Sequence, residues 1–169
     1  MSEARQFQPV ELIRRLTAAE VRFVVIGGLA AQAHGSPSAT FDLDIVPSWD
    51  PANLARLEGV LIEIVATHAG PAHGAPPMPP LDARTLLAGA VFTLDSALGR
   101  LDLLASPDPG LDFDRLMRSA ERRELFGDRV NVASIDDLMA MKRAAGRPKD
   151  RVELEILGAL REEIDRAGG

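Results

Sequence analysis

Five short stretches of the chain are rich in apolar, often β-branched residues and are bounded by glycine, proline or polar residues. Short runs of this kind predict β-strands, and the longest of them are apolar enough to be buried. The predicted strands are 21–26, 41–46, 90–94, 100–104 and 129–133. A turn containing Gly99 separates the third strand from the fourth, so these two are expected to lie next to each other.

Between these runs, apolar residues recur every three or four positions, which is the spacing of amphipathic helices. Four of the predicted helices are 9–19, a short one at 29–33, one after Asp50-Pro51, and 134–145. Another runs from Phe113 to Ala120, with Arg115, Arg118, Arg122 and Arg123 on its polar side. The last predicted helix has an apolar stripe formed by Val152, Ile156, Leu160 and Ile164. Ser134 to Asp137 has the pattern of a capping box, and Gly146 is expected to end the helix that begins there. The proline- and glycine-rich segment 68–80 predicts a loop or a flap.

Strands with helices between them, and no internal repeat, predict an α/β (α+β) fold in which helices pack on a mixed β-sheet. The length of 169 residues is enough for one domain with a proper core. We therefore expect a single domain over 1–169, with a C-terminal helical portion at about 134–167.

The composition excludes several classes of protein. There are no cysteines, so disulfides and thiolate metal sites are excluded. No apolar run is long enough to span a bilayer, and the N-terminus lacks the pattern of a signal peptide, which favours the cytoplasm. The net charge of −6 argues against non-specific DNA binding, although a local basic patch for an RNA end remains compatible with it.

Two acids on one predicted strand are the strongest indication of chemistry. Asp42 and Asp44 alternate with Leu43 and Ile45, so both carboxylates point to the same face of the strand. Two adjacent like charges on a half-buried strand repel each other, and a divalent cation between them relieves that repulsion. The pattern therefore predicts a metal site.

A third carboxylate is expected from a neighbouring strand. Asp102 is flanked by apolar residues inside the predicted strand 100–104, whereas Asp95 follows the end of 90–94 and is the alternative. Gly27 and Gly28 lie between a strand and a short helix, where the absence of Cβ atoms lets a phosphate approach backbone N–H groups. The alternative is that the two glycines form only a tight turn.

These residues resemble the signature of the nucleotidyltransferase superfamily related to DNA polymerase β. The resemblance rests on Ile26-Gly27-Gly28, on Asp42-Leu43-Asp44-Ile45 and on Thr40 before the acids. The segment from Lys142 to Asp150 looks like a run found in small bacterial members, some of them toxin–antitoxin proteins.

The resemblance implies a nucleotidyltransferase-like fold and transfer of a nucleoside monophosphate (NMP) from a nucleoside triphosphate (NTP) to an acceptor hydroxyl, on a protein, an RNA end or a small molecule. It implies Mg²⁺ as the cofactor, two ions with Mn²⁺ as an alternative, held by Asp42, Asp44 and Asp102 as catalytic residues. It also allows a cognate toxin or antitoxin protein as a partner.

The only two lysines, Lys142 and Lys149, are expected either to contact nucleotide phosphates or to be solvated surface residues. Arg147 is a further candidate for phosphate binding. Asp150 either starts the last helix or pairs with Lys149. The arginines on the polar side of the helix after Phe113 are expected to be solvated, with RNA binding as the alternative.

Two other functions stay open. The chain could be a catalytically silent binding module that acts as a toxin–antitoxin partner, although such a module would be expected to lose some of the acids. It could also modify a small molecule, as antibiotic adenylyltransferases do. Those enzymes usually carry a larger acceptor-binding domain, for which little room is left after residue 110.

Overall fold

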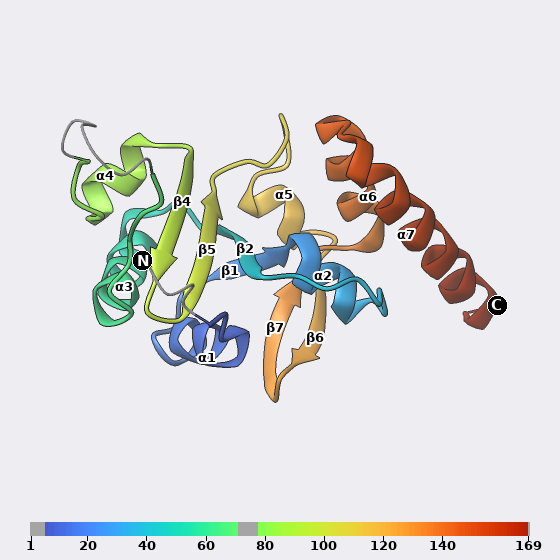
Figure 1. The fold of residues 1–169 in the computed structure, drawn as a ribbon, viewed down its shortest axis with the longest axis horizontal. Helices are drawn as coiled ribbons and strands as arrows, with labels where there is room; N and C mark the ends of the chain where they lie inside the picture. Colours follow the sequence, from blue (N-terminus) through green and yellow to red (C-terminus); the bar gives the residue numbers. More distant parts are fainter. Residues whose placement is uncertain (1–5, 71–77, 169) are drawn as a thin grey trace.

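The protein is built on one mixed β-sheet. The computed structural model describes residues 6–70 and 78–168, and within them seven strands form a sheet in the order β3-β4-β5-β2-β1-β7-β6 (Figure 1). The strands are β1 (Phe23–Ile26), β2 (Asp42–Pro47), β3 (Thr67–His68), β4 (Val91–Ser96), β5 (Gly99–Leu104), β6 (Glu121–Leu125) and β7 (Asp128–Val132). β2 runs parallel to β5, and β1 runs parallel to β7, whereas the other neighbours are antiparallel.

Helices pack around this sheet and continue beyond it to the C-terminus. They are α1 (Pro9–Ala18), α2 (Gly27–Ala33), α3 (Pro51–Glu63), α4 (Ala83–Ala88), α5 (Phe113–Met117), α6 (Ile135–Ala145) and α7 (Pro148–Ala167). Two of them begin at caps that the sequence predicts. Asp50 accepts the backbone N–H of Asn53 at 2.9 Å, and Ser134 accepts that of Asp137 at 3.2 Å. Gly146 ends α6 in the left-handed conformation with φ of 60°.

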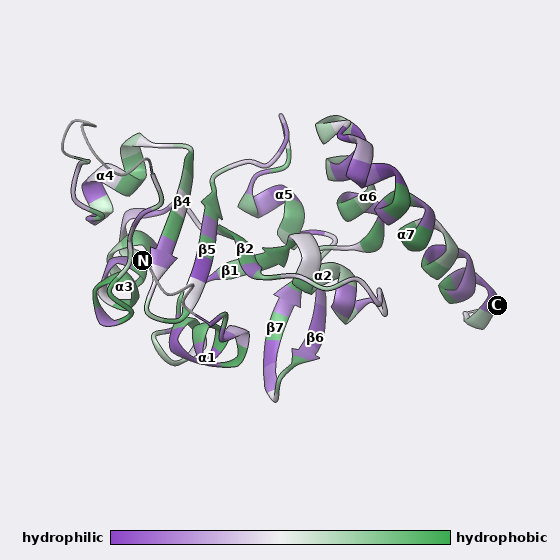
Figure 2. Cartoon of the chain, in the orientation of Figure 1, coloured by the Kyte–Doolittle hydropathy of each residue, from purple (hydrophilic) through white to green (hydrophobic). Residues whose placement is uncertain are grey.

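The core covers one face of β2 and β5 and both faces of β1, all four residues of which are buried. Leu43 and Ile45 of β2 and Leu101 and Leu103 of β5 are fully buried, and they alternate with the acids on the same two strands. β1 is coloured almost entirely hydrophobic in Figure 2, whereas the β6–β7 hairpin is largely hydrophilic. The predicted fold class, a mixed sheet with helices packed on it, is confirmed.

The helix predicted from Phe113 onward is shorter than expected, and this prediction was wrong for its second half. α5 ends at Met117, and Glu121–Leu125 forms β6, which pairs with β7. Phe126 and Gly127 connect the two strands with φ of 56° and 90°, and positive φ at both central residues is typical of a tight hairpin turn. Arg122 and Arg123 therefore lie on an edge strand, because hairpin pairing outweighs the helical spacing.

The apolar stripe predicted for the last helix is also wrong in detail. Val152 is 61% exposed and Ile164 is 44% exposed, and the only fully buried apolar residue of α7 is Leu157. α7 has 20 residues and its neighbour α6 has 11, so part of α7 extends past its packing partner (Figure 1). Helical spacing predicts the helix, but it does not predict how much of the helix finds a partner.

The predicted loop 68–80 is described only in part. His68 belongs to the short strand β3, which pairs with β4, and residues 71–77 lie outside the described residues. Among the helices that the structure describes, none is both long enough and apolar enough to cross a membrane.

Candidate functional site

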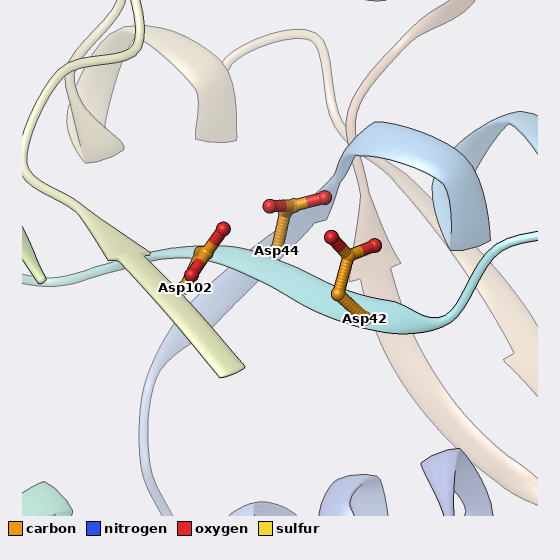
Figure 3. Close-up of side chains that lie close together, drawn as sticks. All are labelled: Asp42, Asp44 and Asp102. Atoms are coloured by element: carbon orange, nitrogen blue, oxygen red, sulfur yellow. The ribbon is translucent and has the colours of Figure 1, made fainter. Parts of the chain in front are cut away.

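Three carboxylates from two neighbouring strands converge on one point. β2 carries Asp42 and Asp44, and the parallel register places Asp102 of β5 directly beside Asp44. One oxygen of each carboxylate lies within 4.8 Å of the others, and all three side chains extend to the same side of the sheet (Figure 3). The alternative third acid, Asp95, instead forms an ion pair with Arg100 at 3.2 Å. The structure thus brings together the three acids that the spacing favours.

The environment of these acids disfavours negative charge. Burial, followed by the charges of Asp42 and Asp102, raises the pKa of Asp44 from 3.8 to about 7. Burial also raises the pKa of Asp102, and the charge of Asp42 adds to the effect. The Thr40 hydroxyl donates a hydrogen bond to Oδ1 of Asp42 at 2.9 Å.

The cluster fits a divalent cation. Asp102 Oδ1 is buried without a hydrogen-bond partner, and buried polar atoms are normally satisfied. Three carboxylates supply hard oxygen ligands of the kind that Mg²⁺ and Mn²⁺ take. A cation between Asp42, Asp44 and Asp102 would satisfy the orphaned oxygen and offset the like charges.

Gly27 places the start of α2 directly against this cluster. Ile26, the last residue of β1, is the antiparallel partner of Asp44, and Gly27 follows it with φ of 66°. A Cβ atom on Gly27 would overlap the carboxylate of Asp44, and one on Gly28 would lie 2.6 Å from the Thr40 side chain. The glycines are therefore required for close approach as well as for the turn.

Replacing Gly27 with alanine is expected to destabilise the protein by about 1–3 kcal/mol, because the new side chain would be held at positive φ and would displace Asp44. Urea unfolding measures this change. The matched control is Gly59→Ala in α3, where a Cβ atom meets nothing within 4 Å. That control is expected to be neutral or stabilising, by up to about 1 kcal/mol. Equal stabilities of the two variants would contradict the close approach.

Lys142 and Arg147 are two basic residues that line the same cleft as the three acids. Lys142 Nζ lies 3.3 Å from Asp150 Oδ1, and Arg147 Nε lies 2.9 Å from Asp150 Oδ2. Asp150 is only 1% exposed. Burial alone would raise the pKa of Asp150, but the hydrogen bonds from Arg147 and Lys142 outweigh it and hold that pKa below its usual value. Asp150 thus pairs with Lys142 and Arg147 rather than with Lys149.

Lys142 also acts on the acid cluster, since its charge lowers the pKa of Asp44. Lys142 lines the same cleft as the three acids. Lys149 is exposed and forms no ion pair in the part of the chain that the structure describes. The rarity of lysine in the sequence drew attention to Lys142, but nothing local indicated that Asp150 would pair with it.

One cleft of about 690 Å³ contains these groups. Its lining includes every site residue predicted from the sequence, namely Gly27, Gly28, Asp42, Asp44, Asp102, Lys142 and Lys149. It also includes Val91 and Leu104, which the sequence reasoning did not consider. The arrangement combines a carboxylate cluster, a helix start without side chains and a basic wall, which together suit a metal-bound phosphate ester.

Solved structures with the same fold are nucleotidyltransferases or proposed ones. The solution structure of the antibiotic-resistance factor ANT(2'')-Ia matches this chain with a TM-score of 0.56 and 15% sequence identity. The match covers 94% of this chain and 92% of that one. The crystal structure of ANT(2'')-Ia in complex with adenylyl-2''-tobramycin matches with a TM-score of 0.57 and 14% identity, and the match covers 95% of this chain and 99% of that one. The crystal structure of TM1012 from Thermotoga maritima, a proposed nucleotidyltransferase, matches with a TM-score of 0.53 and 17% identity. The match covers 98% of this chain and 99% of that one.

No family model and no curated protein matches the chain. At these identities the structural matches show the fold, which is nucleotidyltransferase-like. ANT(2'')-Ia aligns with this chain over nearly the whole of both, and its crystal structure contains adenylyl-2''-tobramycin.

Proposed function

We propose that this protein is a nucleotidyltransferase that moves an NMP from an NTP to an acceptor hydroxyl and releases pyrophosphate. The observation that carries the proposal is the convergence of Asp42, Asp44 and Asp102 within 4.8 Å, with an orphaned buried oxygen on Asp102. The structural likeness to ANT(2'')-Ia and TM1012 supports the same reaction class.

In this proposal the three carboxylates would hold one or two Mg²⁺ ions, or Mn²⁺, and the bound cations would offset the negative charge of the triphosphate and of the leaving pyrophosphate. The backbone N–H groups at Gly27 and Gly28 face the phosphates, and Lys142 and Lys149 neutralise their remaining charge. Catalysis then comes mainly from positioning and electrostatics.

The bond changes follow from this placement. The acceptor oxygen attacks the α-phosphorus, and the bond from that phosphorus to the bridging oxygen of the β-phosphate breaks. Pyrophosphate leaves with the electron pair of the broken bond. Asp102, on the side of the cluster away from the glycines, accepts the proton of the hydroxyl.

The alternative is a catalytically silent binding module that acts as a toxin–antitoxin partner. The intact acid cluster supports the enzyme over this alternative, because buried like charges are costly for a scaffold with no use for them. Incubation with each labelled NTP, Mg²⁺ and a cell extract separates the two. The enzyme labels protein, RNA or small molecules, and EDTA abolishes the label, whereas a silent module labels no fraction.

Lys142→Ala is expected to lower kcat/KM for the NTP by about 5- to 150-fold, which corresponds to a charge-assisted contact of about 1–3 kcal/mol. Lys149→Ala is expected to have a smaller effect, because Lys149 is exposed. Steady-state kinetics at several NTP concentrations measures both. Arg143→Ala, on the exposed side of the same helix, is the control and is expected to keep full activity. Full activity of the Lys142 variant would remove Lys142 from the phosphate site.

A further inference from the structure

Asp150 is a buried acid that connects two helices beside the cleft. It lies in the first turn of α7, its side chain is only 1% exposed, and Lys142 of α6 reaches its Oδ1 at 3.3 Å. Its Oδ2 accepts the Nε–H of Arg147 at 2.9 Å and the backbone N–H of the same residue at 3.1 Å. A buried carboxylate requires such partners, because an unpaired charge in the interior is costly. The positions of Lys142 and Arg147 are therefore tied to Asp150.

The charges of this group do not cancel. Two cations pair with one carboxylate, so Lys142, Arg147 and Asp150 together keep a net charge of +1. The carboxylate is in the interior, whereas the side chains of Lys142 and Arg147 are 22% and 56% exposed. Both cations line the cleft, and Asp150 is not among the lining residues. The cleft is therefore in contact with the positive side of the group, which suits an anionic part of a ligand.

Lys142 is also close to the acid cluster. It lines the cleft together with Asp42 and Asp44, and its charge lowers the pKa of Asp44. A lysine side chain that is free in water has many rotamers, and a ligand that orders it has to offset the lost entropy. The ion pair with Asp150 orders the Lys142 side chain before any ligand binds. A phosphate bound beside the acids would thus meet an ammonium group that is already in position.

Lys149 provides a comparison within the same cleft. It lines the cleft as Glu153 does, four residues later on α7, and residues at this spacing lie on one face of a helix. Lys149 is nevertheless exposed, and within residues 6–70 and 78–168 neither it nor Glu153 forms an ion pair. The two opposite charges offset each other in part while both side chains stay solvated. A buried acid as a partner is what distinguishes Lys142 from Lys149.

We infer that Asp150 is a positioning residue of the phosphate site, which holds Lys142 and Arg147 as a preorganised pair of cations facing the triphosphate. The inference rests on the proposed function and names the residue on which its phosphate contacts depend. It also adds Arg147 to those contacts. The junction of α6 and α7 is then part of the nucleotide site, since an acid in the first turn of α7 fixes a lysine of α6 (Figure 1).

The lysine content of the chain makes this inference measurable without turnover. Lys142 and Lys149 are the only lysines, so protein labelled with ¹³C at lysine Cε gives two side-chain NMR signals, which a Lys149→Arg variant assigns. In the free wild type we expect more restricted motion at Lys142 Cε than at Lys149 Cε. Addition of Mg²⁺ and an NTP analogue that cannot be cleaved at the α-phosphate should shift the Lys142 signal. Equal mobility of the two lysines, or binding of the analogue with no shift at Lys142, would overturn the inference.

Asp150→Asn removes the charge that orients Lys142 and keeps an oxygen that can accept the backbone N–H of Arg147. We expect the Lys142 side chain to become as mobile as that of Lys149. The Kd of the analogue is expected to rise by about tenfold or more, the size of a lost charge-assisted contact. A folded Asp150 variant with wild-type mobility at Lys142 and a wild-type Kd would contradict the positioning role.

The matched control is Asp136→Asn. Asp136 of α6 also pairs with a cation of α7, Arg161 at 2.7 Å, but both side chains are exposed and neither lines the cleft. We expect this variant to keep the wild-type mobility of Lys142 and a Kd within about twofold, because exposed ion pairs contribute little. An equal loss of affinity in the control would show that any contact between α6 and α7 has the same effect, and the specific role of Asp150 would be lost.

A second variant covers the case in which Asp150→Asn does not fold. Arg147→Gln leaves Asp150 paired with Lys142, so Lys142 should stay ordered while the Kd of the analogue rises by about threefold or more. An unchanged Kd would remove Arg147 from the proposed pair of cations. The proposed function is tested separately in the same samples. Absence of Mg²⁺-dependent binding of the analogue to the wild type would count against that function, whereas binding without a response at Lys142 would count against the inference alone.

Discussion

The double variant Asp42→Asn, Asp44→Asn is expected to lose NMP transfer by a factor on the order of 10³ or more, which corresponds to about 4 kcal/mol of transition-state stabilisation. Asparagine keeps the shape of each side chain but removes the charge that binds the cation. Asp102 alone would then remain of the cluster, and a single carboxylate is a weak site for a divalent cation. Release of labelled pyrophosphate at saturating Mg²⁺ and NTP measures the loss.

The matched control is Asp95→Asn. Asp95 is an acid on the same face of the sheet, but it is exposed and pairs with Arg100 outside the cluster. Removing an exposed pair of this kind changes stability by about 0–1 kcal/mol, and activity is expected to stay close to that of the wild type. If the double variant kept wild-type turnover, Asp42 and Asp44 would be removed as the catalytic metal site. Any toxicity on expression should disappear in the double variant and persist in the Asp95 variant.

The single variant Asp44→Asn is expected to be more stable than the wild type at pH 8 without metal. The pKa of Asp44 is about 7 in the folded protein, above its ordinary value of 3.8, so the folded state holds the proton more tightly than the unfolded state. This group therefore makes stability fall as the pH rises from about 4 to about 7, and its full penalty is present above pH 7. Three pKa units set an upper limit of about 4 kcal/mol on the gain from asparagine.

Urea unfolding in EDTA at pH 8, 6.5 and 5 measures this gain, which should shrink as the pH falls because Asp44 becomes neutral in the folded wild type. Addition of Mg²⁺ at pH 8 should stabilise the wild type and leave the variant nearly unchanged, because binding to the folded state alone shifts the unfolding equilibrium. A variant no more stable than the wild type at pH 8 would show that the charge of Asp44 is not costly in the folded protein.

The sequence alone carried the local features of this protein. Strand alternation placed Asp42 and Asp44 on one face, and the caps at Asp50 and Ser134 predicted helix starts that the structure contains. These features depend on residues a few positions apart, so neighbouring side chains and backbone groups suffice to determine them. The same reasoning placed Asp102 ahead of Asp95, which was expected after the end of a strand. Asp95 in fact lies within β4, and its pairing with Arg100 keeps it out of the cluster.

The tertiary structure decided everything that depends on pairing between distant segments. The register of β2 against β5 puts Asp102 beside Asp44, and hairpin pairing turns Glu121–Leu125 into a strand despite its helical spacing. Asp150 pairs with Lys142 rather than with Lys149 because the packing of α7 on α6 brings Lys142 within 3.3 Å, whereas its contact with Arg147 is local to the first turn of α7. Likewise, Val91 lies exposed beside the acids only because the sheet face formed by β4 and β5 stays open. Contacts of this kind are set by which surfaces pack together, and no pattern within a single segment contains that information.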